Sequence, residues 1–445
     1  MKNKLLALSV ALALSTPLFA DRLMVLKCSE DGIPGQTEPA LMGFSISANG
    51  KYICGAIESA SGIFVADTQN GEVKWKLADE SGGELRGIDN DGLAIGFLDA
   101  DAVLTPFESM DIEVLKAPSD VRNFLGESLT NDGSLMVGSL TEQSFNTVAA
   151  YYSKDSGWNT LPMPSEAEVG NLKDLFNEVS AAKFVSGDGK VILGHLGSFT
   201  YPIVWKMNDA GVYEPDFFPA RYVKVTEEDK EDDSKPLLGL PAFYTAMSNN
   251  GKYVGAVGTI SDEYGDIRVV PVIYNTEDKT LKIYSQPQII DEYGLSLYPR
   301  AIADDGTFIG MIGVSIINGN GCFIMKAGSD IAERFVDVFP AYSEKFGQCD
   351  EVGYCVPTGI SADGSKILGY AYYSDDLYDD IDNPAYYTTF VIEVDGTGVE
   401  EINSSKEQRL PDAIYSIDGR SLRELSKGIN IIRNSDGSVS KILKK

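Results

Sequence analysis

Histidine and tryptophan are the scarcest residues in this chain of 445 residues, which contains one histidine, His195, and three tryptophans. One histidine excludes a metal centre built from several histidines, and it limits any Ser-His-Asp triad to His195 itself. Basic residues are also outnumbered, since 37 Lys and Arg stand against 66 Asp and Glu for a net charge of −29. A surface with this negative charge repels phosphate backbones and anionic lipids. Nucleic acid is therefore not expected as a partner.

Long apolar runs are absent beyond the first twenty residues, so we expect no membrane span. The chain begins with a basic segment at Lys2 and Lys4, a short apolar run over residues 5–14 and small residues up to Ala20. This order is typical of a secretory signal peptide cleaved after Ala20. The sequence therefore predicts a signal peptide over residues 1–20 and an exported protein of the cell surface, outer envelope, periplasm or medium.

Cysteine is infrequent, with five residues at Cys28, Cys54, Cys322, Cys349 and Cys355. They form no CxxC pair, which argues against a cysteine-bound zinc ion. Export permits disulfides, and Cys349 and Cys355 are close enough in sequence to close a small loop. We therefore consider a disulfide between Cys349 and Cys355, with at least one other thiol left over because the count is odd.

Glycine and tyrosine are plentiful, with 44 and 22 residues, as is typical of turn-rich β proteins. One short pattern recurs seven times: small and apolar residues, a polar turn that ends in glycine, then a β-forming run that ends in a second glycine. The seven copies start at Phe44, Leu85, Glu127, Lys183, Thr245, Arg300 and Thr358.

Each copy predicts a tight hairpin, because Asn-Gly and Asp-Gly supply the positive φ that such turns need. Further β-forming runs follow every copy, so one unit indicates a four-stranded meander, the unit of a propeller blade. The sequence thus predicts an all-β fold, a seven-bladed β-propeller over residues 21–400. We expect residues 23–27 to close the ring beside residues 390–394, and the second glycine to let neighbouring blades approach closely.

The repeat resembles extracellular β-propeller families built on Ser-x-Asp-Gly units, which implies the fold and little about activity. After a polar linker at residues 401–412, residues 413–445 resemble the C-terminal sorting tail of secreted and surface proteins of Bacteroidetes. The matching residues are Tyr415, Gly419, Arg420, Gly428 and Lys441. The resemblance implies an exported envelope protein with a type IX-like signal, and the alternative is a plain C-terminal hairpin.

Length variation falls mainly in the second turns and in the connections between blades, which share one face of a propeller. Loops on a rigid scaffold commonly carry binding residues. On that face we place candidate ligand-binding residues that combine aromatic and acidic groups, suited to stacking on sugars, and the single histidine. They are Tyr372, Tyr373, Asp375, Asp376, Tyr378, Tyr386 and His195.

These features favour a non-catalytic exported propeller that binds a protein or a glycan at the cell envelope. No catalytic residue and no cofactor is assigned, although the carboxylates near Tyr378 are also ligands that Ca²⁺ accepts. Two alternatives stay open: a carbohydrate-active enzyme with paired carboxylates in the channel mouth, and a structural surface protein.

Overall fold

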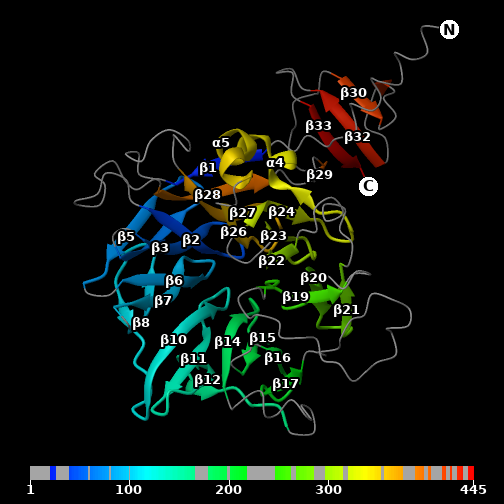
Figure 1. The fold of residues 1–445 in the computed structure, drawn as a ribbon. Coiled ribbons are helices and arrows are strands. Elements are labelled where there is room, and N and C mark those ends of the chain that lie inside the picture. Colours follow the sequence, from blue (N-terminus) through cyan, green and yellow to red (C-terminus); the bar gives the residue numbers. More distant parts are fainter. Residues whose placement is uncertain are drawn as a thin grey trace, which may run out of the picture. The chain divides into compact units, whose positions relative to one another are not determined.

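The computed structural model describes residues 21–26, 40–58, 61–79, 82–99, 101–165, 179–197, 201–217, 246–261, 267–284, 296–313, 319–351, 355–373, 386–394, 399–401, 413–416, 421–422, 428–433 and 439–444. The chain divides into two compact units, of which one is Leu23–Glu393 and the other includes Val394–Lys445. In the first unit, the described strands form seven four-stranded sheets arranged around a ring in chain order (Figure 1). The prediction of a seven-bladed β-propeller is confirmed.

Each blade is a meander of neighbouring antiparallel strands, numbered along the chain from the inside of the ring outwards. Blades 1 to 3 are β2(Leu41–Ile46) to β5(Val73–Leu77), β6(Gly83–Ile88) to β9(Glu113–Val114), and β10(Val121–Leu129) to β13(Gly157–Thr160). Blades 4 to 6 are β14(Ser180–Val185) to β17(Tyr213–Phe217), β18(Ala246–Met247) to β21(Thr280–Ile283), and β22(Ser296–Ile302) to β25(Glu333–Arg334). Blade 7 contains β26(Cys355–Ile360), β27(Lys366–Tyr373) and β28(Tyr386–Val394).

The ring is closed by the N-terminal strand β1(Asp21–Val25), which lies beside β28 as the outer strand of blade 7 (Figure 1). The Leu26 N–H donates to the Thr389 carbonyl at 2.9 Å. Leu26 is 3% exposed and packs in one core cluster with Leu368 and Val391 of the same blade. The expected closure beside the last blade is confirmed.

The first turn of each blade owes its shape to a hydroxyl-bearing or acidic residue and a glycine. In blade 1 the Ser47 hydroxyl donates to Asn49 Oδ1 at 2.7 Å and accepts the Tyr52 N–H at 2.9 Å. Gly50 then takes φ +69°, which side chains rarely adopt. The first glycine of every copy lies between φ +64° and +93°. The repeat is therefore a turn motif whose side chains form hydrogen bonds with backbone groups of the same turn.

The second glycine has a role different from the predicted one. A Cβ atom on Gly138 would lie 1.9 Å from the carbonyl oxygen of Leu125, on the inner strand of the same blade. The register between these two strands shifts between Gly126 and Ser128, which marks a β-bulge. The prediction that this glycine relieves crowding between blades is therefore wrong, because the crowding lies within one blade.

Adjacent blades are held together by apolar side chains on both faces of every sheet. Between blades 3 and 4, Val137 packs in one buried cluster with Ile192 and Trp205. Trp205 is fully buried, and its Nε1 donates to the Pro162 carbonyl at 2.7 Å. The strands are almost continuously hydrophobic because both faces of each blade are covered by neighbouring blades.

The connection from blade 6 to blade 7 contains the helices α4(Phe335–Val338) and α5(Pro340–Glu351). Phe335, Tyr342 and Phe346 of these helices are fully buried, and the rings of Tyr342 and Phe346 contact Phe390 of β28. Neither of these helices, nor any other helix in the described ranges, is long and apolar enough to cross a membrane.

The C-terminal unit contains one five-stranded sheet in the order β29-β33-β32-β30-β31. Its strands are β29(Val399–Glu401), β30(Ala413–Ser416), β31(Ser421–Leu422), β32(Gly428–Arg433) and β33(Val439–Lys444). Tyr415, Gly428 and Lys441 lie on β30, β32 and β33, whereas Gly419 and Arg420 lie outside the described residues. Residues 1–20, Cys28 and residues 402–412 also lie outside them, so the signal peptide, the linker and the sorting function stay predictions.

Candidate binding site

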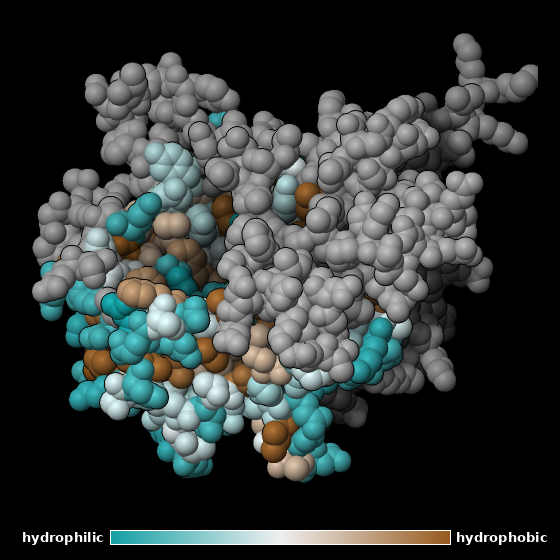
Figure 2. All heavy atoms as spheres, turned by 60° about the horizontal axis from the view of Figure 1, so that its bottom comes forward, coloured by the Kyte–Doolittle hydropathy of each residue, from teal (hydrophilic) through white to brown (hydrophobic). Residues whose placement is uncertain are grey.

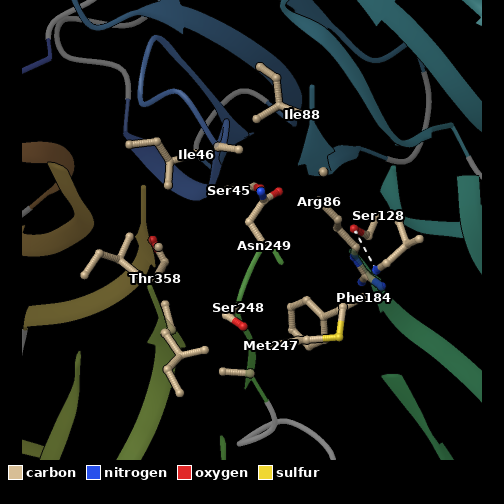
Figure 3. A pocket seen from close by; sticks show the side chains of 18 of the residues that line it. Ser45, Ile46, Arg86, Ile88, Ser128, Phe184, Met247, Ser248, Asn249 and Thr358 are labelled. Carbon is tan, nitrogen blue, oxygen red and sulfur yellow. Dashed lines mark hydrogen bonds between the residues drawn. The ribbon is translucent and has the colours of Figure 1, made fainter. Parts of the chain in front are cut away.

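The inner strands of the seven blades surround a central tunnel with a cavity of about 150 Å³. All seven blades contribute residues to its lining, and in Figure 3 Asn249 lies near the middle of the view. Pockets for small-molecule ligands usually measure about 300–1,000 Å³. The tunnel therefore has room for a group of side-chain size rather than for a whole oligosaccharide.

One end of the tunnel is bordered by a ring of first-turn residues from all seven blades, which we call the first-turn ring. Its members are Ala48, Asn90, Asn131, Gly187, Asn249, Asp304 and Ala362. Five of the seven pairs of neighbouring blades are linked by backbone hydrogen bonds. The N–H groups and the carbonyls that accept from them are Asn90 to Asn131 (3.1 Å), Asn131 to Gly187 (3.1 Å), Gly187 to Asn249 (2.7 Å), Asp304 to Ala362 (2.9 Å) and Ala362 to Ala48 (2.9 Å).

Asparagine side chains make the two remaining links of the first-turn ring. Asn90 Oδ1 accepts the Asn49 N–H at 2.9 Å, and Asn49 Nδ2 donates to the Asn90 carbonyl at 3.1 Å. Asn250 makes the same pair of bonds to Asp304, at 2.7 and 3.2 Å. Every pair of neighbouring blades is thus joined at this end of the tunnel, and the first-turn ring is a continuous ring of hydrogen bonds.

A network of charged groups joins the inner strands of blades 2, 3 and 4. Glu127 Oε1 accepts from Arg86 Nη1 at 2.7 Å and from Lys183 Nζ at 2.5 Å, while Arg86 Nε donates to Glu84 at 2.9 Å. The Glu127 side chain is only 10% exposed. Burial alone would lower the pKa of Arg86, but Glu127 and Glu84 raise it above its usual value. The Arg86 guanidinium therefore stays charged, and the carboxylates of Glu84 and Glu127 both bind it.

These charged residues were not predicted from the sequence, although the repeat contains a signal for them. Four inner strands have a charged residue at the same position of the repeat, two residues before Ile88, Leu129, Val185 or Ile302. These charged residues are Arg86, Glu127, Lys183 and Arg300. The other copies have Phe44, Thr245 and Thr358 in that column. Four charges in one column of a buried repeat indicate a shared environment, here the wall of the tunnel.

Aromatic side chains of blades 1 and 7 pack against one another, and Phe44 of this group lines the cavity. The Phe44 ring meets Tyr370 edge-on at 6.1 Å, and Tyr387 stands 5.8 Å from Tyr370 and 5.0 Å from Tyr372. Burial raises the pKa of Tyr370, against the opposing effect of Arg300. Burial also raises the pKa of Tyr387, so the hydroxyls of Tyr370 and Tyr387 are neutral at neutral pH.

The candidate tyrosines lie on paired strands. Tyr372 pairs with Tyr387 and Tyr373 with Tyr386 in the register of β27 and β28. The rings of Tyr372 and Tyr387 are half-buried and tilted by 56° to each other, so they do not form a flat platform for a sugar. Asp375, Asp376 and Tyr378 lie outside the described residues, so the rest of this candidate site stays a prediction.

His195 lies on β15(Val191–Leu196), opposite Ala181 and Pro202 of the neighbouring strands. Burial, together with Lys183, lowers its pKa to about 4. Its Nδ1 atom is buried and makes no hydrogen bond with the described part of the chain. His195 is therefore neutral at physiological pH.

The proposed disulfide is not formed, since Cys349 and Cys355 are both free, buried thiols. They lie near Asp350, which accepts the Tyr342 hydroxyl at 2.7 Å and the Cys322 N–H at 2.9 Å. Burial raises the pKa of the Cys349 thiol to about 11 and that of Cys355 well above its usual value. Cys349, on α5, and Cys355, at the start of β26, are therefore buried core residues in this structure.

Metal ligands do not gather in the described residues, where no group of three or more His, Cys, Asp or Glu side chains is placed to hold an ion. The calcium site suggested by the sequence falls on residues 375–382, which are outside the described ranges. No metal is therefore assigned to the tunnel.

Among solved structures, the chain is similar to hydrazine synthase of Kuenenia stuttgartiensis, with 12% identity, a TM-score of 0.46 and coverage of 77% of this chain and 96% of that one. It is also similar to the RRP9 WD40 repeats (9% identity, TM-score 0.45, 84% and 97% covered). TolB from Acinetobacter baumannii is 13% identical, with a TM-score of 0.38 and 68% and 64% covered. No protein-family model and no curated protein sequence matches the chain.

Proposed function

We propose that this protein is an exported, non-catalytic β-propeller that binds a protein partner at the cell envelope. Binding takes place on the face that carries the second turns and the connections between blades, which we call the long-connection face. The observation that carries the proposal is topological: in an up-and-down blade, the first and third turns share one end and all other connections share the opposite end. The variable loops therefore surround one mouth of the tunnel.

An exposed aromatic residue on the long-connection face supports a protein partner. Phe145, in the second turn of blade 3, is 72% exposed and takes φ +72°. Its N–H donates to the Glu142 carbonyl at 3.0 Å, and the Arg122 guanidinium lies 3.8 Å from its ring centroid. Aromatic residues, including Phe, and arginine are enriched at protein interfaces relative to the rest of the surface. A turn that holds Phe145 out of the core is suited to such a contact.

The charges in the tunnel favour binding over catalysis. Glycoside hydrolysis needs two carboxylates with distinct proton affinities, one of which is a proton donor. Glu84 and Glu127 each accept a hydrogen bond from Arg86, so both carboxylates are held in ion pairs within the wall. This arrangement favours a structural role for the two carboxylates over a catalytic one.

The location at the envelope rests on the sequence. The basic and apolar N-terminus supports export, and the tail residues Tyr415, Gly428 and Lys441 support a surface protein with a sorting-like tail. The strong net negative charge favours solubility of the exported protein. In the coloured part of Figure 2, hydrophilic residues lie beside smaller groups of hydrophobic residues. A surface of this kind suits a binding protein that is soluble on its own.

The test is affinity capture from a solubilised cell envelope with the full chain and with Phe145→Ser. The matched control is Val212→Ser, because Val212 is also exposed, at 57%, but lies in the third turn of blade 4 on the opposite face. We expect Phe145→Ser to lose a captured protein that Val212→Ser retains. Equal capture by both variants, or no specific protein with the unchanged chain, contradicts the proposal. N-terminal sequencing of the exported protein tests cleavage after Ala20.

A further inference from the structure

The inner strand of blade 3 differs from the inner strands of the other blades. β10 contains nine residues, whereas β2, β6, β14 and β26 contain six each and β22 contains seven. All six strands have one register shift, at the position of the repeat that Glu127 occupies in blade 3. β10 has a second shift between Val121 and Asn123, near its long-connection end. β-Bulges often redirect a side chain next to a functional site, so this second bulge calls for a role of its own.

Arg122 is the extra residue of the second bulge. Val121 pairs with Glu142 and Asn123 with Thr141, so Arg122 has no paired residue on β11. Its side chain is exposed, and its guanidinium lies 3.8 Å from the centroid of the Phe145 ring. The bulge and the second turn of blade 3 thus bring one arginine and one phenylalanine together on the long-connection face.

The guanidinium of Arg122 keeps its hydrogen-bond donors for other groups. Within the described ranges it forms neither an ion pair nor a side-chain hydrogen bond, and its contact is the face of the Phe145 ring. The carboxylate of Glu142, in the same turn as Phe145, instead accepts the Ser144 hydroxyl at 3.0 Å. An arginine has five N–H groups in a planar fork, and stacking on a ring uses none of them. This cation is therefore prepared to bind an acceptor from outside the described chain.

Phe145 adopts a backbone conformation that is uncommon for a bulky residue. Its φ of +72° lies in the left-handed region, and its side chain is 72% exposed, so burial in a core does not stabilise this conformation. The turn is closed by backbone hydrogen bonds from Phe145 to Glu142 at 3.0 Å and from Glu142 to Asn146 at 2.8 Å. Residues held in such conformations cluster at binding sites. The ring is thus presented to solvent by a hydrogen-bonded turn, with Arg122 over one face.

We propose that Phe145 and Arg122 form a docking site for a protein partner that carries a carboxylate beside an apolar side chain. The inference rests on the proposed function and adds the chemistry of the partner. The apolar side chain packs on the ring of Phe145, and the carboxylate accepts two N–H groups of Arg122, the bidentate geometry that a guanidinium favours. A polyanion is disfavoured because the net charge of −29 repels it, whereas a single carboxylate needs only one arginine.

The first test is selection of random displayed peptides on the unchanged full chain. We expect enriched peptides to combine Asp or Glu with a neighbouring aromatic or aliphatic residue. They should bind Val212→Ser, which alters an exposed residue of the opposite face, and should lose binding to Phe145→Ser. The proposal is overturned if no such peptide is enriched, or if the enriched peptides bind Phe145→Ser as well as they bind the unchanged chain.

A double-mutant cycle then tests the ion pair. The strongest acidic peptide and its counterpart with an amide in place of the carboxylate are titrated calorimetrically against the full chain. We expect the acid to bind about tenfold more tightly than the amide, because only the acid forms charge-assisted hydrogen bonds with arginine. Arg122→Gln should bring this ratio near one, and Arg122→Lys, which keeps the charge but not the fork, should give an intermediate value.

Lys190→Gln is the matched control, since Lys190 is an exposed cation in a first turn and its loss should leave the ratio unchanged. A tenfold ratio that persists in Arg122→Gln assigns the carboxylate to another residue and overturns the proposal. Urea melts should show Arg122→Gln to be as stable as the unchanged chain, because Arg122 is exposed.

The inference and the proposed function can fail separately. If Arg122→Gln captures the same envelope protein as the unchanged chain while Phe145→Ser does not, the proposed function stands and the acidic partner is excluded. If no envelope protein is captured but acidic peptides still depend on Arg122, the proposed function falls and the docking site stands.

Discussion

Gly187 lies so close to Asn131 of the preceding blade that a Cβ atom on Gly187 would stand 2.2 Å from Asn131 Nδ2. Asn249 of the following blade approaches the same point, with its Oδ1 atom at 2.6 Å. The three residues are also consecutive members of the first-turn ring, joined by backbone hydrogen bonds. Glycine in blade 4 therefore makes room for the amide side chains of blades 3 and 5 at the narrow end of the tunnel.

Gly187→Ala should destabilise the propeller by about 1–2 kcal/mol, because the new methyl group displaces both amides. These amides are the ends of side chains, so a second change can relieve the clash. In the Gly187→Ala background, Asn131→Ala should restore about 1 kcal/mol, measured as a coupling energy in a double-mutant cycle of urea melts. Additive effects of the two changes contradict the contact.

The second glycine of the repeat should be essential for stability in some blades and dispensable in blade 5. Gly138→Ala puts a methyl group 1.9 Å from the backbone oxygen of Leu125, which cannot move without breaking the bulge. We expect a loss of about 3 kcal/mol in the free energy of unfolding. Gly255 holds the same position in blade 5, but its nearest atom is 3.6 Å away, so Gly255→Ala should change stability by less than about 1 kcal/mol. Similar losses for both would refute the explanation.

The sequence predicted the fold because the repeat is a local turn motif. The bonds of Ser47 to Asn49 and Tyr52 span two and five residues, so their chemistry is visible within one copy. Seven copies then imply seven blades. The bulge opposite Gly138 was not predicted, because it depends on the register between two strands. The sequence identified the glycine but not the backbone atom that it avoids.

The candidate site could be predicted only in part, because its residues are brought together by the ring. Arg86 and Lys183 are separated by 97 positions, yet both bind the same oxygen of Glu127. No local pattern predicts such a contact, although the shared motif column gave an indication. The tyrosines near residue 372 were found from composition, which does not specify the tilt between two rings.

Removal of the charge on Glu127 should be costly, because two cations share one of its oxygens. Glu127→Gln leaves Arg86 and Lys183 facing each other across a neutral amide, and we expect a loss of about 2 kcal/mol in urea melts. Glu84→Gln is the matched control, since the Glu84 side chain is 30% exposed and forms an ion pair with one cation, Arg86, among the described residues. It should cost clearly less. If Glu84→Gln proves as harmful as Glu127→Gln, the shared oxygen is not the source of the stability.

Closure of the ring should depend on one apolar residue next to β1. Leu26 is 3% exposed, and Leu26→Ala removes buried methyl groups from the core of blade 7. We expect a loss of about 3 kcal/mol in one cooperative transition. Met24→Ala is the control, because Met24 is only half-buried at the edge of the same cluster. A separate early transition in Leu26→Ala would instead mean that the closing strand unfolds by itself.

His195 should make the stability of the propeller depend on pH between about 6.5 and 4. Its pKa in the folded state is about 4, below the value of 6.5 for an exposed histidine, so the unfolded chain binds the proton more tightly. The stabilisation is therefore complete above pH 6.5 and is lost as the pH falls towards 4, by roughly 2 kcal/mol between pH 7 and pH 5.

His195→Gln keeps a neutral polar side chain at this position and removes the titration. The difference in unfolding free energy between the original chain and His195→Gln should therefore shift by roughly 2 kcal/mol in favour of the variant when the pH is lowered from 7 to 5. Urea melts at both pH values measure it, and the carboxylates common to both proteins cancel in the comparison. A constant difference would mean that His195 is hydrated and titrates as an exposed histidine, which would make it available to a ligand after all.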